Sequence, residues 1–125
     1  MTSSNIAYQV LDQSWDHNKM ELLEEFKVML LNRQNRVLDV LNVAQGGFSE
    51  VMIDQKVMFS AALKACASGI ILSHNHPSSE LRPSEADIRL NRKMVEGGKL
   101  LGIEVHDHII LSAYGYYSFM DEGMM

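Results

Sequence analysis

The stretch GIILSHNHP, residues 69–77, decides how this chain folds, and residues 78–87, SSELRPSEAD, follow it directly. Its first five residues form a short apolar run, which predicts a buried strand. Residues 78–82 form a loop, and residues 83–87 open a helical pattern with Ser84 as the expected N-cap. Because side chains two positions apart on a strand point to the same side, the imidazoles of His74 and His76 can converge on one point.

A carboxylate completes this arrangement. Asp87 falls in the first turn of the expected helix and can face the same point as the two imidazoles. Two histidines and one carboxylate leave a fourth position open, which is typical of a catalytic rather than a structural zinc site. Each of these residues alone is more often an ordinary loop residue than a ligand. Their combination at a strand end and a capped helix predicts a zinc site with His74, His76 and Asp87 as ligands.

A catalytic zinc site also needs a general base within reach of the water that the metal activates. Glu24 and Glu25 are the upstream candidates, at the start of an apolar run. On a strand, Glu24 shares a face with Phe26 and points inward, whereas Glu25 alternates outward. We therefore predict Glu24 as the base, although a solvated surface acid is the alternative for both residues.

Two roles fit Ser84. Its side chain can cap the helix, and its hydroxyl can also lie near the zinc and donate a hydrogen bond to an oxyanion. One residue can fill both roles in part, and the sequence does not separate them.

Hydrophobic spacing predicts the remaining elements. They are a helix over 6–15 capped by Ser3 or Ser4, a β-hairpin of 24–32 and 36–43, helices over 57–67 and 84–96, and strands over 69–74, 103–111 and 114–119. Gly46-Gly47 indicates a turn or bulge before a weakly patterned loop, and Gly97-Gly98 is a stop signal unless the helix runs into it. Helices that alternate with strands indicate an α/β (α+β) fold with a mixed central sheet flanked by helices.

Length and composition predict one domain, residues 1–125, with an N-terminal helix and connector over 1–19 and a metal-site core over 20–125. Hydrophobic residues make up 46% of the chain, which is too many for a disordered protein. The formal charge of −5 disfavours broad nucleic-acid binding, which needs a basic surface, although it leaves room for a local basic patch.

The single cysteine, Cys66, cannot form an internal disulfide, which favours a reducing, cytoplasmic location. It stands among alanines in a helical pattern, so we expect a small buried apolar residue rather than a reactive thiol. The N-terminus carries no leader pattern, and no apolar run approaches the roughly 20 residues of a membrane helix.

Glu24 together with HNHP at 74–77 and SEAD at 84–87 resembles the JAB/MPN (JAMM) zinc-metallopeptidase motif. More closely, the chain resembles the JAB domain of the RadC family, from about residue 24 to residue 123. Further residues that carry the resemblance are Phe26, AALK at 61–64, Ser78 and DHII at 107–110. The resemblance implies a JAB/MPN-like (cytidine-deaminase-like) fold and zinc bound by His74, His76 and Asp87. It also implies that Glu24 acts through the water and that Ser84 assists.

The sequence departs from the family pattern in three places. Ser79 stands where the family usually has a glycine after HNHPS. A Pro-Arg-Glu element that often precedes the alanine-rich helix is replaced by residues 54–56, and the helix-hairpin-helix region of longer members, their most obvious DNA-binding part, has no counterpart in this sequence. Asp107 and His108 fit the pattern, and we expect at most a supporting or structural role for them.

Three functions follow as hypotheses. The leading one is a zinc-dependent metallohydrolase, a peptidase or isopeptidase, with Zn²⁺ as cofactor and a peptide or protein as substrate. The second is a DNA-repair-associated accessory role, which the family name alone suggests and the charge disfavours. The third is a non-catalytic metal-binding interaction module. No membrane partner is expected.

Overall fold

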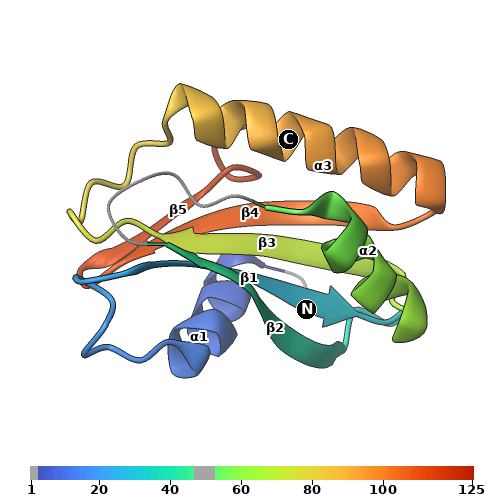
Figure 1. Ribbon diagram of the computed structural model, residues 1–125, viewed down its shortest axis with the longest axis horizontal. Coiled ribbons are helices and arrows are strands. Elements are labelled where there is room, and N and C mark those ends of the chain that lie inside the picture. The colour runs from blue at the N-terminus through green and yellow to red at the C-terminus, as the bar shows by residue number, and fades with distance from the viewer. Residues whose placement is uncertain (1–2, 47–52) are drawn as a thin grey trace.

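A computed structural model of the chain describes residues 3–46 and 53–125. These residues form three helices and a five-stranded mixed sheet with the strand order β2-β1-β3-β4-β5 (Figure 1). The elements are α1 (Ser4–Ser14), β1 (Glu24–Leu31), β2 (Val37–Gly46), α2 (Gln55–Lys64), β3 (Gly69–Asn75), α3 (Glu85–Leu101), β4 (Glu104–Ser112) and β5 (Gly115–Ser118). The predicted α+β fold with a mixed sheet flanked by helices is confirmed, whereas the turn predicted at Gly47 lies outside the described residues.

The sheet combines a hairpin with a parallel crossover. β1 pairs antiparallel with both β2 and β3, and β3 pairs in parallel with β4 through the intervening α3. The predicted hairpin turn is confirmed: the Asn32 side chain accepts from the backbone N–H groups of Gln34 and Arg36, and Asn35 adopts a left-handed φ of 60°. Asparagine tolerates this conformation better than most residues, which suits it to the turn.

The two faces of the sheet carry separate hydrophobic cores. α2 and α3 cover one face and α1 covers the other (Figure 1). Along β1, Phe26 and Val28 pack beneath α2 and α3, whereas Met29 and Leu31 pack against α1, as the two-residue period of a strand requires. Both faces of the central strands are therefore buried.

The face that carries Glu25 and Lys27 was expected to be outward, and this prediction is wrong. Glu25 is 5% exposed and Lys27 is 8% exposed, because α1 and the segment after it cover that face. The Lys27 ammonium donates to the Ser14 carbonyl at 2.6 Å and lies 4.7 Å from the centre of the Trp15 ring. The Glu25 carboxylate accepts from the Asn42 amide at 2.9 Å. Each buried charge therefore has a polar partner.

α2 ends earlier than predicted, at Lys64, and Cys66 is exposed rather than buried in the helix. Cys66 adopts a left-handed φ of 56°. Its N–H donates to the Leu63 carbonyl, and the N–H of Ala67 donates to the Ala62 carbonyl, the bonding pattern of a Schellman motif. The left-handed residue changes the chain direction at the end of α2, so that Ala67 packs against the core beneath this helix.

α3 continues past the predicted stop at Gly97-Gly98 and ends at Leu101, with Gly102 as a left-handed cap at a φ of 71°. A Cβ atom on Gly98 would lie only 2.3 Å from the carbonyl oxygen of Ile103. Gly98 is therefore needed for the close approach between the last turn of α3 and the start of β4, and it does not end the helix.

Replacing Gly98 by alanine is expected to destabilise the protein by about 1–3 kcal/mol, because the added methyl group collides with backbone. This cost outweighs the gain in helix propensity of about 1 kcal/mol. Gly97→Ala is the matched control, since its Cβ would meet only the side chains of Phe59 and Gln55, at 3.2 and 3.3 Å. Chemical denaturation of both variants measures the difference. Equal stabilities would contradict the close-approach explanation.

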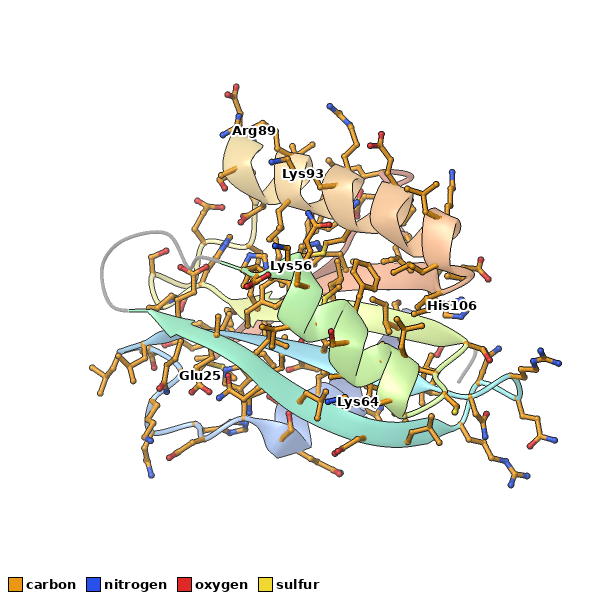
Figure 2. The ribbon with its side chains drawn as sticks, turned by 45° about the vertical axis from the view of Figure 1, so that its right-hand side comes forward. Glu25, Lys56, Lys64, Arg89, Lys93 and His106 are labelled. Atoms are coloured by element: carbon orange, nitrogen blue, oxygen red, sulfur yellow. The ribbon has the colours of Figure 1, made fainter. Side chains whose placement is uncertain are left out.

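The outer surfaces of α2 and α3 are charged. Figure 2 shows Lys64 on α2 and Arg89 and Lys93 on α3, and all three residues are exposed. Apolar residues of the same helices, among them Phe59 and Met94, face the sheet. Over residues 3–46 and 53–125, the structure has no helix whose length and apolar character would let it cross a lipid bilayer.

Candidate metal centre

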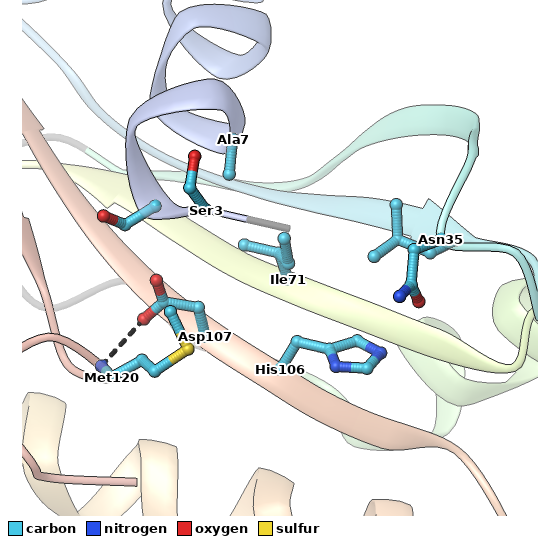
Figure 3. Close-up of a pocket in the computed structure, with 9 residues that line it drawn as sticks. Ser3, Ala7, Asn35, Ile71, His106, Asp107 and Met120 are labelled. Carbon is cyan, nitrogen blue, oxygen red and sulfur yellow. Dashed lines mark hydrogen bonds between the residues drawn. The ribbon is translucent and has the colours of Figure 1, made fainter. Parts of the chain in front are cut away.

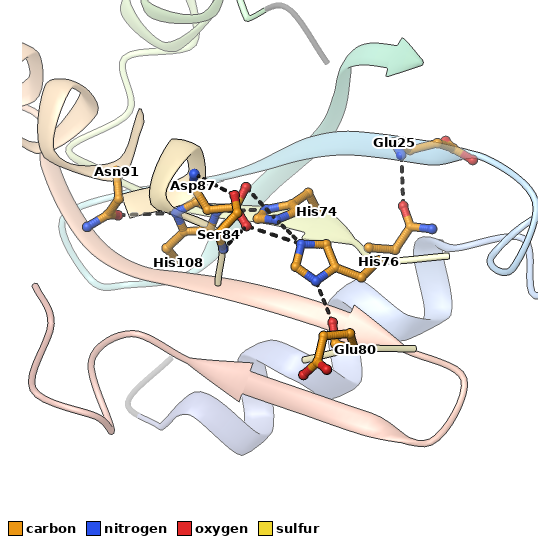
Figure 4. Close-up of polar contacts among 9 residues, drawn as sticks. Glu25, His74, His76, Glu80, Ser84, Asp87, Asn91 and His108 are labelled. Atoms are coloured by element: carbon orange, nitrogen blue, oxygen red, sulfur yellow. Dashed lines mark hydrogen bonds and ion pairs between the residues drawn. The ribbon is translucent and has the colours of Figure 1, made fainter. Parts of the chain in front are cut away.

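The predicted site residues meet where the end of β3, the beginning of β1 and the first turn of α3 come together (Figure 4). The candidate ligand atoms of Glu24, His74 and His76 all lie within 4.8 Å of one another. The Asp87 carboxylate joins the same two imidazoles: its oxygens lie 3.3 Å from His74 Nε2 and 3.2 Å from His76 Nε2. The structure thus brings two imidazoles and two carboxylates together from three elements.

His74 is fixed by the sheet and His76 by the loop that follows it. His74 is 1% exposed, and its ring stacks on Phe26 with 5.9 Å between centroids and a 5° angle between planes. The backbone N–H of His76 donates to the Leu111 carbonyl on β4, and its Nδ1 bonds to the Glu80 carbonyl. A carbonyl oxygen can only accept, so His76 Nδ1 carries the hydrogen and a neutral ring keeps its lone pair on Nε2.

Asp87 is held by the cap of α3. Its backbone N–H donates to Ser84 Oγ at 3.0 Å, and its carboxylate accepts from the Ser84 N–H at 2.9 Å, so the predicted capping role of Ser84 is confirmed. Burial raises the pKa of Asp87, but hydrogen bonds to His74 and His76, the charge of His74 and the Ser84 N–H together hold that pKa well below its usual value. The carboxylate is therefore ionised where it faces the imidazoles.

A buried chain of hydrogen bonds sets the tautomer of His74. Asn91 Oδ1 lies 3.2 Å from His108 Nδ1, and His108 Nε2 lies 2.9 Å from His74 Nδ1 (Figure 4). An amide oxygen only accepts, so His108 Nδ1 holds the hydrogen. Burial lowers the pKa of His108 well below its usual value, so the ring is neutral and its Nε2 accepts from His74 Nδ1. In a neutral His74 ring the lone pair is thereby left on Nε2, facing the site.

When both rings are neutral, the atoms that meet at the centre are therefore hydrogen-bond acceptors. The two Nε2 atoms are 3.1 Å apart, and the ionised Asp87 carboxylate contacts both. Lone pairs at this distance repel one another unless a proton or a cation lies between them. Burial lowers the pKa of His76, but its hydrogen bond to Asp87, the Glu80 carbonyl and the charges of Asp87 and Glu24 raise it overall. The centre thus attracts positive charge, either a proton or a metal ion.

Comparison with known proteins assigns a family to this arrangement. The chain matches the family model of the RadC-like JAB domain over residues 1–124. The chain belongs to the RadC-like JAB domain family. The resemblance that the sequence motifs suggested is confirmed, and it extends over nearly the whole chain.

Curated relatives of this RadC-like JAB chain carry the name UPF0758 protein. Those of Flavobacterium johnsoniae and Alkaliphilus metalliredigens are 41% and 43% identical over 101 and 102 residues, which are 81% and 82% of this chain and 44% of each relative. The one of Porphyromonas gingivalis is 37% identical over 126 residues, which cover 100% of this chain and 54% of the relative. The chain spans about half the length of these relatives, whose name states no activity.

The departure of this RadC-like JAB sequence at Ser79 has a structural consequence. Ser79 adopts a left-handed φ of 67°, and its N–H donates to the His76 carbonyl at 2.9 Å. This is a conformation that glycine adopts without steric cost, which explains a glycine at the same place of the family pattern. The serine keeps the turn that follows the two histidines, at the expense of local backbone strain.

Asp107 and His108 point to opposite faces of the sheet, as neighbours on a strand do, and a bulge in β4 determines which face each one takes. Ile70 pairs with Val105 and Ile71 pairs with Asp107, so His106 is the extra residue. The bulge shifts the alternation and places His108 beside His74. Asp107 instead lines a cavity of about 280 Å³ beneath α1 (Figure 3), where it accepts from Ser118 Oγ and the Met120 N–H.

Asp107 therefore holds the C-terminal segment in place, whereas His108 contacts His74 of the candidate metal centre. Sequence analysis expected no more than support from either residue, and it missed Asn91 completely. Asn91 is 3% exposed on α3 and lies 17 positions before His108, with no motif that connects the two residues. The only signal was a polar residue on the inward face of an amphipathic helix.

Replacing Asn91 by leucine is expected to lower the affinity for zinc about 10- to 100-fold, because His108 loses the acceptor that fixes its tautomer and, through it, the tautomer of His74. Arg92→Leu places the same side chain at the neighbouring exposed position and is the matched control. Competition with a chromogenic chelator measures both affinities. Equal affinities for the two variants would show that the hydrogen bonds from Asn91 through His108 to His74 do not affect metal binding.

The metal-stripped protein is expected to show a pH-dependent contribution of His76 to stability. The pKa of His76 is raised in the folded state. Its contribution is therefore fully present below the unfolded pKa of about 6.5 and is lost as the pH rises through the folded pKa. Urea unfolding of the parent and of His76→Gln in chelator should give stabilities that converge as the pH rises above about 6.5. A difference that grows with pH would contradict this sign.

Proposed function

We propose that this RadC-like JAB chain is a zinc-dependent hydrolase of amide bonds, a peptidase or isopeptidase that acts on a peptide or protein. The observation that supports the proposal most is the convergence of four groups on one point. Two imidazole Nε2 atoms lie 3.1 Å apart, the Asp87 carboxylate contacts both, and Glu24 offers a second carboxylate. Metallohydrolases need both a ligand set and a separate base, and this cluster contains enough groups for both.

The donor set fits zinc. Zinc binds imidazole nitrogen and carboxylate oxygen, and three such ligands leave a coordination position open. His74, His76 and Asp87 would hold the ion, and their partners, His108, the Glu80 carbonyl and the Ser84 N–H, orient them. Bound zinc supplies Lewis acidity, which makes water a competent nucleophile near neutral pH.

Asp87 and Glu24 divide the two carboxylate roles according to how each is held. The Asp87 carboxylate is fixed by the Ser84 N–H and already touches both Nε2 atoms, which suits a ligand. Glu24 approaches from another element, as the first residue of β1. In the proposed reaction, a Glu24 carboxylate oxygen takes a proton from the attacking water and later delivers it to the leaving amine nitrogen.

Ser84 contributes to this reaction through its hydroxyl. Ser84 Oγ accepts the hydrogen bond from the Asp87 N–H, so its own hydroxyl hydrogen can be donated elsewhere. We propose that it is donated to the oxyanion that develops on the substrate carbonyl. The capping role and the oxyanion role are compatible, because they use different parts of one hydroxyl group.

Replacing Glu24 by glutamine is expected to keep zinc bound but to lower peptide turnover about 10²- to 10⁴-fold, because the variant lacks a proton acceptor. Glu25→Gln is the matched control: Glu25 neighbours Glu24 in sequence but lies on the other face of the sheet, and a glutamine can keep the bond to Asn42. Asp87→Asn should instead lose zinc. Metal analysis and cleavage of a peptide library by zinc-loaded protein measure all three.

Two results would overturn this assignment. If Glu24→Gln loses zinc while Asp87→Asn keeps it, the two carboxylates have exchanged roles. If Glu24→Gln cleaves peptides as fast as the parent, Glu24 is not the base.

A further inference from the structure

We propose that Asn75 is a positioning residue that fixes Glu24 beside the imidazoles of His74 and His76. Asn75 stands between the two histidines in sequence, but it lies on the opposite face of β3 from His74, because the side chains of a strand alternate. It is 0% exposed. The proposal assigns this buried amide a purpose in the site that its two neighbours form.

The paired register of β1 with β3 ends before Glu24, so a side chain that ties the start of β1 to β3 helps to fix the position of Glu24. The register between β1 and β3 runs from Leu31 opposite Gly69 to Phe26 opposite His74. Glu24 and Glu25 lie beyond that last pair, and they pair with β2 through Gly46 and Gln45. The paired register of β1 and β3 therefore ends two residues before Glu24 is reached.

The Asn75 amide supplies this connection with three hydrogen bonds. Its Oδ1 accepts from the Glu25 N–H at 2.7 Å, and its Nδ2 donates to the carbonyls of Leu23 and Met20, each at 2.7 Å. Both hydrogens of the amide nitrogen are thus used. Figure 4 shows Glu25 on β1 with its backbone N–H bonded toward the end of β3.

The Asn75 side chain connects the sequence neighbours of Glu24 to the strand that carries the two histidines. The residues on either side of Glu24 are both bonded to the Asn75 side chain, and the residues on either side of Asn75 are the two imidazoles. A shift of the backbone at Glu24 relative to His74 and His76 would strain these bonds. A misplacement of about 1 Å can cost about 10²-fold in rate, so this side chain controls whether Glu24 can reach the reacting water.

The catalytic part of this inference rests on the proposed function, whereas the positional part does not. Replacing Asn75 by alanine removes all three bonds. We expect the Glu25 amide to exchange with solvent at least about tenfold faster, while the Val28 and Leu30 amides within the β1–β3 register keep their exchange rates. Zinc affinity should change less than about threefold, because the bonds that hold His74, His76 and Asp87 are untouched, and peptide turnover should fall about 10²-fold.

Two further variants sharpen the test. Asn42→Ala is the matched control, since it removes an amide hydrogen bond to the Glu25 side chain but leaves the backbone bonds of Asn75, and it should behave like the parent. Asn75→Ala in a Glu24→Gln background should cost no further turnover, because the residue that Asn75 positions has already lost its function. A general loss of stability would instead lower turnover in both backgrounds.

If Asn75→Ala does not fold, Asn75→Asp takes its place, because it keeps the acceptor for the Glu25 N–H but loses the donors to Leu23 and Met20. Its turnover should lie between those of the parent and Glu24→Gln. The proposal is overturned if the Glu25 amide stays as protected as in the parent, if Asn75→Ala matches Asn42→Ala in turnover, or if the losses of Asn75→Ala and Glu24→Gln multiply. If the zinc-loaded parent cleaves no peptide, the proposed function fails, and amide exchange alone decides whether Asn75 holds the segment.

Discussion

The repulsion between acceptor atoms at the end of β3 is the constraint on which the rest of this structure depends. His74 Nε2 and His76 Nε2 lie 3.1 Å apart beside an ionised carboxylate, an arrangement that only positive charge can stabilise. The surrounding residues hold these side chains in place: Phe26 stacks on one ring, the Glu80 carbonyl and His108 bond the outer nitrogens, and Ser84 holds the carboxylate.

Because side chains alternate along β3, the residues that hold the candidate metal centre lie on both faces of the sheet. His74 faces α3, and its hydrogen bond to His108, which in turn bonds Asn91, fixes its tautomer. Asn75 faces the core beneath α1 and bonds the segment around Glu24. A bulge in β4 makes this division possible, because without the extra residue His106 the side chain of His108 would point away from His74. Local strand geometry therefore determines which residues can serve the site.

The sequence predicts much of this fold because its local patterns are strong. The two-residue period of β1, the hairpin turn and the cap at Ser84 each depend on residues a few positions apart, and all three are confirmed. Asn75 bonds Glu25 across 50 positions, and Asn91 bonds His108 across 17, so no local pattern could pair them. The sequence left open whether the helix stops at Gly98 or continues through it, because glycine serves both helix ends and close approaches, and only the position of Ile103 distinguishes these uses.

α3 carries two parts of the centre on consecutive turns. Asp87 and Asn91 are four positions apart on this helix and therefore lie on the same side of it. The Asp87 carboxylate and the Asn91 amide that bonds His108 thus pack against the sheet together. A cation in the centre would therefore link α3 to the sheet, because its ligands come from both. A ligand that binds only the docked arrangement raises the free energy of undocking by mass action. The metal-loaded domain should consequently resist proteases along α3 better than the metal-free one, independently of any catalysis.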